Sequence, residues 1–172
     1  MNLREEQQHM LGLLKNGSPG LVADPLLMEK LEFQRKIIVW WRCFQFEHWL
    51  ILTSKLLKDQ HLLEPLVINL YQQHNISSYP AEAGEQFVEY ILQQPISSLI
   101  KSVAMLELAL IKLKDPGHLT EHRIRWNTSP FPFLDALLKG REYSLEDENN
   151  VAYEMVVSNQ LSEKMMVRAL VL

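Results

Sequence analysis

The feature that most constrains the fold is one long segment, from Leu26 to about Lys58, whose pattern is helical throughout. Nothing obvious within this segment breaks a helix. Asp24 and Pro25 stand just before it, and an Asp N-cap followed by Pro at the first helical position is a typical helix start. The segment therefore predicts either one long helix or two consecutive helices, in a chain that is mainly α.

Other segments also have helical patterns. The clearest runs from Ser97 to Lys114, where leucines and a valine recur at alternating intervals of four and three and form a core stripe. Asp115-Pro116-Gly117 ends this helix sharply. We expect residues 1–115 to form a helical bundle domain. The remaining helical segments are Leu3–Lys15, Leu62–Gln73, Ala83–Gln93 and Phe133–Lys139.

The last third of the chain differs in composition. Residues 116–141 contain a proline-rich, extended stretch and predict a linker with one short helix. Residues 142–172 are an acidic appendage in which the alternation from Val151 to Val157 predicts a strand. A second strand, or alternatively a short helix, follows from Lys164 to Leu172. The predicted fold class is mainly α: a helical bundle with a small C-terminal β element, as a hairpin or short strands.

Length and charge exclude several classes of protein. A chain of 172 residues can bury a core of its own, and its single cysteine excludes an internal disulfide framework. The net charge of −4 does not favour nucleic acid or an anionic membrane. The N-terminus is polar where a signal peptide needs an apolar run, and no apolar stretch approaches the roughly 20 residues of a membrane span. We therefore expect a cytoplasmic protein without membrane contact.

Motifs for catalysis are weak. His118, Glu121 and His122 match the H-x-x-E-H pattern of inverted zincins, in which two histidines on one helix face bind zinc. The Asp-Pro-Gly turn just upstream and the short remaining chain favour a polar loop or helix start, so a zinc hydrolase is a remote alternative. There is no serine-nucleophile motif and no glycine-rich phosphate loop. Cys43 is interpreted as a small core residue. We expect no catalytic residue, no metal and no cofactor.

Glu107 is an unusual charged residue, because it lies inside the apolar stripe of the helix predicted at Ser97–Lys114. A carboxylate there is costly unless it is paired or hydrogen-bonded. We interpret Glu107 as a structural anchor between helices, since a catalytic role would need a second acid that the sequence does not identify. The candidate partners are Arg35, Arg42, His48 and Lys101.

A cluster of aromatic and basic residues in the long segment is the strongest candidate for function. Trp40 and Trp41 point about 100° apart on a helix, so one of them can be partly exposed. The ordinary interpretation is a central helix packed on both sides, and the functional one is a surface for a peptide or nucleic acid. The cluster comprises Phe33, Trp40, Trp41, Phe44, Phe46 and Trp49, with Lys30, Arg35, Lys36 and Arg42 between them.

The candidate binding residues are Arg35, Trp40, Trp41 and Arg42 from this cluster, and Tyr153 from the predicted C-terminal strand. That strand would suit the capture of a peptide by strand addition if its edge is open.

The order of segments in the chain resembles one bacterial family. The similar stretches are Leu56–Leu66 (LLKDQHLLEPL), Tyr71–His74 (YQQH) and Ser77–Ile91 (SSYPAEAGEQFVEYI). Met105–Ala109 (MLELA) occupies the place of a family helix with Leu-Glu-Trp-Ala, and Asn127–Gly140 is similar to the family's linker. On these motifs the chain resembles the family of the HvfC and BufC type, which is named for DNA binding. At Leu108 the chain has leucine where the family motif usually has tryptophan.

The DNA-binding label is a name rather than a demonstrated activity for most members of that family. The resemblance implies a helical partner of an iron-dependent TIM-barrel enzyme that modifies ribosomally made peptides, where the partner helps to bind the precursor peptide. The first hypothesis is therefore a non-catalytic module that binds a protein or precursor peptide. The sequence does not decide whether the protein forms a homo-oligomer through exposed aromatic residues.

The alternative hypothesis is a DNA-binding transcriptional regulator. It rests on the family label and on basic residues. These residues are Lys30, Arg35, Lys36, Arg123 and Arg125.

Overall fold

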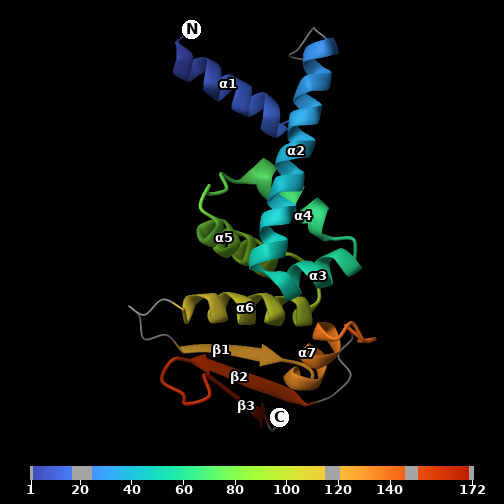
Figure 1. The fold of residues 1–172 in the computed structure, drawn as a ribbon, viewed down its shortest axis with the longest axis vertical. Coiled ribbons are helices and arrows are strands. Elements are labelled where there is room, and N and C mark those ends of the chain that lie inside the picture. The colour runs from blue at the N-terminus through green and yellow to red at the C-terminus, as the bar shows by residue number, and fades with distance from the viewer. Residues whose placement is uncertain (1, 17–24, 115–120, 146–150, 171–172) are drawn as a thin grey trace.

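The computed structural model describes residues 2–16, 25–114, 121–145 and 151–170, which are mainly helical with a small C-terminal sheet (Figure 1). This confirms the predicted fold class. None of the described helices combines the length and the hydropathy that a membrane span requires. In chain order the elements are α1 (Leu3–Asn16), α2 (Pro25–Trp49), α3 (Ile51–Asp59), α4 (Leu63–Gln73), α5 (Pro80–Gln93), α6 (Ser98–Lys112), β1 (Glu121–Trp126), α7 (Pro130–Leu138), β2 (Ala152–Ser158) and β3 (Met165–Leu170).

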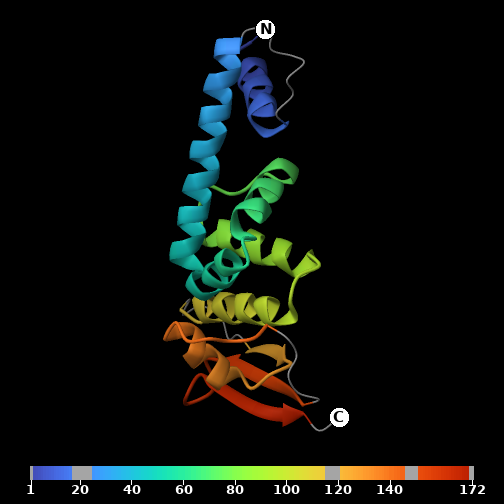
Figure 2. The ribbon, with the colours of Figure 1, turned by 90° about the vertical axis from the view of Figure 1, so that its right-hand side faces the viewer.

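Helix α6 lies between helices α2–α5 and the sheet, and α7 lies on the sheet side of α6 (Figure 1, Figure 2). Helices α3 and α5 contact α6 from one side, and strand β1 contacts it from the other. Leu99, Val103 and Leu106 of the predicted core stripe are buried. Ile100 and Ala104 are buried as well, because a helix covered on two sides buries more than one stripe.

The sheet is antiparallel with the strand order β1-β2-β3. Ile124 pairs with Met155, and Met155 pairs with Val167 on its other side. Ile124, Trp126 and Met155 belong to the same hydrophobic core as the helices. The prediction of a linker is therefore wrong at residues 121–126, which form a strand of this sheet. The alternative of a short C-terminal helix is wrong too, because β3 is the second strand of the predicted hairpin.

Two helices begin at prolines, earlier than the sequence pattern predicted. Helix α5 begins at Pro80 and α7 begins at Pro130. Proline lacks the N–H that the first helical turn leaves without an intrahelical acceptor, so it fits this position without loss. The stretch before Phe133, predicted to be extended, is thus partly the first turn of α7.

The long segment predicted as one helix or two is two helices, α2 and α3, separated at Leu50. Leu50 has φ −125° and ψ 65°, and its side chain makes no capping hydrogen bond. Helix α6 supplies the cap instead. Glu107 Oε1 accepts a hydrogen bond from the Leu52 N–H and Oε2 accepts one from the Thr53 N–H, each at 2.8 Å. These are N–H groups that a helix start leaves without an intrahelical acceptor.

Glu107 thus anchors α6 to the N-terminus of α3. The prediction of its partners was wrong: they are backbone N–H groups rather than the side chains of Arg35, Arg42, His48 or Lys101. Burial raises the pKa of the Glu107 carboxyl, and the hydrogen bonds from the α3 backbone lower it in part. The positive end of the α3 dipole also favours a carboxylate at this place.

Candidate functional site

Helix α2 has two apolar faces, and the body of the protein covers only one of them. On the covered face Leu31 and Phe46 are each 1% exposed. The Phe46 ring stacks on the Phe87 ring of α5, with 4.2 Å between the ring centroids. Phe46 therefore belongs to the main core, where it joins α2 to α5.

The opposite face of α2 is a stripe of exposed apolar residues. Phe33 is 64% exposed and Trp40 is 63% exposed. Each residue of an α-helix is rotated by about 100° from the one before it. On this basis the stripe covers roughly 100° of the circumference of α2 and lies roughly opposite Phe46. We call this set the α2 stripe: Phe33, Ile37, Trp40, Trp41 and Phe44.

The aromatic rings of the α2 stripe contact one another. Phe44 stacks with Trp40 at 5.8 Å and with Trp41 at 5.6 Å between ring centroids. His48 lies beyond Phe44, with 4.1 Å between their ring centroids. The interpretation of α2 as a helix packed on both sides is therefore wrong, because these rings are left on the surface. Contiguous exposed apolar surface of this kind is typical of an interaction site.

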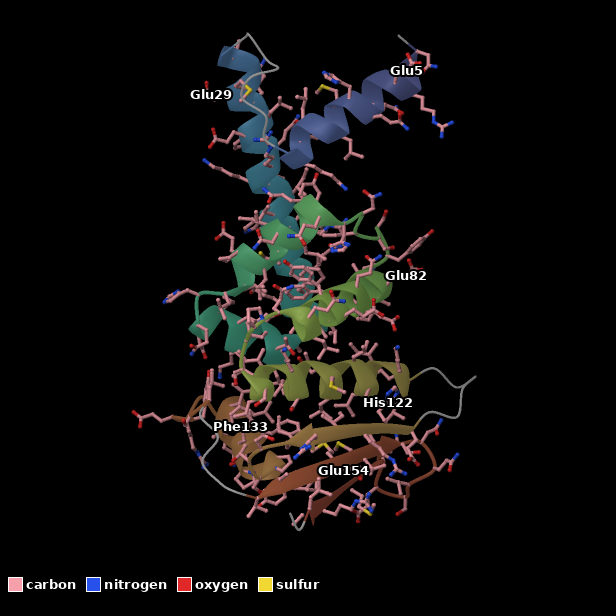
Figure 3. The ribbon with its side chains drawn as sticks, turned by 180° about the vertical axis from the view of Figure 1, so that it is seen from behind. Glu5, Glu29, Glu82, His122, Phe133 and Glu154 are labelled. Carbon is pink, nitrogen blue, oxygen red and sulfur yellow. The ribbon has the colours of Figure 1, made fainter. Side chains whose placement is uncertain are left out.

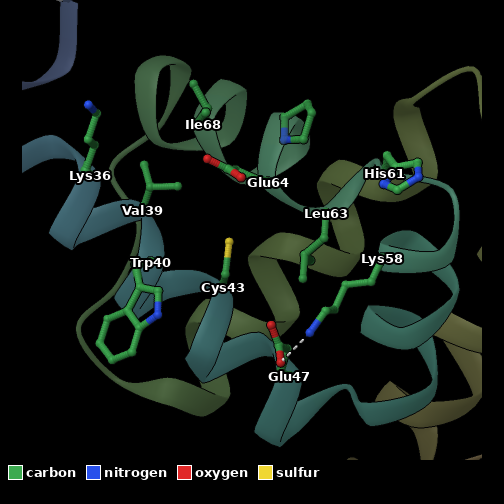
Figure 4. Close-up of a pocket in the computed structure, with 11 residues that line it drawn as sticks. Lys36, Val39, Trp40, Cys43, Glu47, Lys58, His61, Leu63, Glu64 and Ile68 are labelled. Atoms are coloured by element: carbon green, nitrogen blue, oxygen red, sulfur yellow. Dashed lines mark hydrogen bonds and ion pairs between the residues drawn. The ribbon is translucent and has the colours of Figure 1, made fainter.

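A groove of about 680 Å³ runs beside the α2 stripe, between α2, the end of α3 and α4. Figure 4 shows Trp40 at its edge, Lys36 near one end and the ion pair of Glu47 with Lys58 toward the other. The Lys58 Nζ lies 3.0 Å from the Glu47 Oε2. The apolar part of the lining comprises Val39, Trp40, Cys43, Leu63, Pro65 and Ile68, and the polar part comprises Lys36, Glu47, Lys58, His61 and Glu64.

Cys43 lies in this groove, where its thiol is held in the protonated form. Burial raises the pKa of the Cys43 thiol to about 11, and the nearby carboxylates of Glu64 and Glu47 add to the rise. A nucleophilic cysteine needs the opposite shift. The interpretation of Cys43 as a small core residue is therefore only partly right, because Cys43 packs against the core but is half-buried and lines the groove.

This shift predicts slow alkylation of the folded protein. The rate of reaction of Cys43 with iodoacetamide should still be rising at pH 10, because the thiolate is the reacting form and its fraction grows up to a pH of about 11. The same chain unfolded in urea should level off near the ordinary thiol pKa of about 8.5. A folded-state rate that levels off at or below pH 9 would contradict the placement of Cys43.

The two candidate arginines bind the protein's own backbone. Arg35 Nε donates a hydrogen bond to the Leu14 carbonyl at 2.7 Å, and its second guanidinium nitrogen donates to the Leu13 carbonyl. Arg42 donates to the Ser77 carbonyl at 2.9 Å, and desolvation lowers its pKa. Arg35 thus closes the C-terminus of α1, and Arg42 holds the loop before α5. Both contacts give the guanidinium groups a structural role in holding the protein's own backbone.

Replacing Arg35 with methionine should loosen α1 selectively. The change removes two hydrogen bonds at the end of this helix, worth about 1–2 kcal/mol together. Amide hydrogen exchange in residues 3–16 should accelerate about tenfold, while α5 and α6 keep their rates. Lys36→Met is the matched control, because its side chain is exposed and, among the described residues, forms its ion pair with Glu32 of the same helix. Equal exchange in both variants would show that Arg35 does not hold α1.

Tyr153 is far from the other candidate residues. It lies on β2, at the opposite end of the molecule from the start of α2 (Figure 1). Its strand is the central one and pairs on both sides, so the prediction of strand addition to it is wrong. The structure places Trp40 at the groove, Trp41 next to Trp40 on the α2 stripe, and Tyr153 in the packing of the sheet.

The zinc pattern does not have the geometry that a zincin needs. Glu121 and His122 are in strand β1, where adjacent side chains point to opposite faces, instead of in a helix. Figure 3 shows His122 on the sheet. His118 lies outside the described residues. In the part of the chain that the structure describes, no three His, Cys, Asp or Glu side chains gather as metal ligands.

The basic residues of the DNA-binding alternative are also dispersed. Lys30 and Lys36 lie on α2, whereas Arg123 and Arg125 lie on β1 beyond α6 (Figure 1). Arg123 is paired with Glu121 at 2.8 Å. These residues do not form one basic face.

Sequence reasoning missed part of this site. Ile37 belongs to the α2 stripe, and its spacing of four from Phe33 and three from Trp40 could have identified it. Glu64 and Ile68 of α4 line the groove, but nothing near them in the sequence indicates that α4 packs beside Trp40. No protein-family model, no curated protein and no solved structure matches this chain.

Proposed function

We propose that the protein is a non-catalytic binding module that holds an apolar segment of a protein or peptide in the groove between α2 and α4. The observation that supports this most strongly is the groove itself, a surface cleft of about 680 Å³ with a largely apolar lining and an exposed tryptophan at its edge. Clefts of this size and lining are typical binding sites.

The chemistry of the groove favours an amphipathic segment as its occupant. Val39, Cys43 and Ile68 offer apolar contacts along its length. Lys36 lies near one end, and Glu64 of α4 lies between Ile68 and Leu63 (Figure 4). A helix with apolar residues on one face, laid in such a groove, would bury that face and keep its charged residues in contact with the rim and water.

The resemblance to the HvfC and BufC type supports a more specific form of this proposal. In that form the bound segment belongs to a precursor peptide, or to the enzyme that modifies it, in the cytoplasm. The protein would then supply binding and orientation, and the chemistry would belong to the partner. The protonated Cys43 thiol is consistent with a groove that binds without reacting.

Site-specific photo-crosslinking tests this function. A benzoylphenylalanine placed at Ile68, inside the groove, should form a covalent adduct with a second protein in cells that make this chain naturally. The same group at Phe131, an exposed position on α7, is the matched control and should give no such adduct. Mass spectrometry of the adduct identifies the partner. Identical patterns at the two positions, or no adduct from Ile68, would contradict the proposed function.

A further inference from the structure

The α2 stripe repeats every seven residues. Phe33 and Trp40 are one heptad apart, and so are Ile37 and Phe44. Apolar residues at two positions per heptad are the pattern by which two helices pack along each other. In Figure 2 helix α2 runs along one side of the molecule, and none of the other described helices or strands lies outside it. The stripe is therefore available along the helix to another helix.

The residues around the stripe are complementary to a second copy of α2 that runs antiparallel. When Ile37 of one copy faces Trp40 of the other, Phe33 faces Phe44 in the same alignment. One turn further out, Lys30 faces Glu47. Glu47 already accepts a hydrogen bond from Lys58, and a carboxylate can accept a second donor. One alignment thus pairs apolar with apolar residues and positive with negative ones.

The alignment continues toward both ends of α2, where Glu29 of one copy faces His48 of the other. It ends there, because the chain turns at Leu50 between α2 and α3. An antiparallel arrangement uses the same face of both copies, so it forms a closed pair rather than a chain of molecules. We infer that a second copy of this protein covers the α2 stripe, in an antiparallel homodimer with Ile37 of each copy facing Trp40 of the other.

The charges beside the stripe disfavour a membrane as its occupant. Glu29 and Glu32 accompany Lys30 and Lys36 over the same part of α2. An interfacial helix usually has a strongly basic polar face that meets anionic lipid.

The homodimer goes beyond the proposed function, because it uses the α2 stripe, whereas Ile68 and Leu63 on the α4 side of the groove lie off the stripe.

Sedimentation equilibrium of the full chain tests this inference. The wild-type protein should be a dimer at micromolar concentration. Phe33→Lys and Phe44→Glu should each raise the dimer dissociation constant at least about 100-fold, because each change places two charges against phenylalanine rings in a symmetric pair. Both positions are exposed, so circular dichroism should show an unchanged helix content.

Mixing the two variants tests the alignment. In the antiparallel pair the lysine at 33 of one copy faces the glutamate at 44 of the other, and the remaining Phe44 and Phe33 still meet. The mixture should therefore form a heterodimer at concentrations where each variant alone is a monomer. A monomeric wild-type protein would overturn the inference. A wild-type dimer whose variants fail to associate on mixing would also overturn it, since a parallel pair behaves that way.

Phe131→Lys is the control for a general effect of added charge, and it should leave the dissociation constant unchanged. The crosslinking from Ile68 is independent of this test. Loss of the dimer with a persisting adduct would refute the homodimer alone, and a dimer without an adduct to another protein would refute the proposed function alone.

Discussion

Replacing Phe46 with alanine should lower the free energy of unfolding by about 3–5 kcal/mol, the usual cost of removing a large aromatic side chain from a core. Phe46 is 1% exposed and stacks on Phe87, so the change opens a cavity between α2 and α5. The loss is a large part of the stability of an ordinary domain. Equilibrium unfolding in urea, followed by circular dichroism, measures it.

Phe44→Ala is the matched control, because Phe44 is two residues away on the same helix and is 40% exposed. In dilute protein this change should cost about 1 kcal/mol or less, since the ring contacts mainly other rings of the α2 stripe. Similar losses in the two variants would show that the stripe is part of the core. A large loss at Phe46 alone would show that α2 has one structural face and one free face.

Replacing Glu107 with alanine should lower the free energy of unfolding by about 2–4 kcal/mol. The change leaves the N–H groups of Leu52 and Thr53 without an acceptor, and Thr53 is fully buried. It also removes a negative charge from the positive end of the α3 dipole. Urea unfolding measures the loss, and a value below about 1 kcal/mol would contradict the anchoring role.

Glu107→Gln is the control for the shape of this anchor, and it should be less destabilising than alanine because one carbonyl oxygen still accepts a hydrogen bond.

The Glu107 carboxyl should also make the free energy of unfolding depend on pH. Burial raises the pKa of Glu107 in the folded state, so the folded chain holds this proton more tightly than the unfolded chain. The stability that the bound proton gives is complete below the pKa that Glu107 has in the unfolded chain. It is lost as the pH rises through the pKa that Glu107 has in the folded chain. The glutamine variant should lack this loss.

The helices and the hairpin were predictable because their signals are local. Leucines at intervals of three and four identify α6, and alternation from Val151 to Val157 identifies β2. The break at Leu50 was not predictable, because its cap comes from Glu107, far away in the sequence. Strand β1 was missed because its alternating residues sit in a proline-rich, charged region and become a strand only by pairing with β2.

The candidate site was predictable in part for the same reason. The sequence identifies the aromatic residues of α2 and the angle between Trp40 and Trp41. It does not say which of two apolar faces the rest of the chain covers, since that depends on where α4 and α5 pack. The backbone contacts of Arg35 and Arg42 were not predictable, because a basic residue among aromatics has the same local pattern whether it meets a ligand or a backbone carbonyl.

Hydroxyl-radical footprinting tests most directly whether the exposed face of α2 is an interaction surface. Oxidation of each aromatic side chain is compared between the dilute purified chain and the assembly isolated from cells that make it. We predict at least severalfold protection of Trp40 and Phe44 in the assembly, and unchanged oxidation of Tyr79 and Phe131, which are exposed elsewhere. Equal oxidation of Trp40 and Phe44 in both samples would contradict the account.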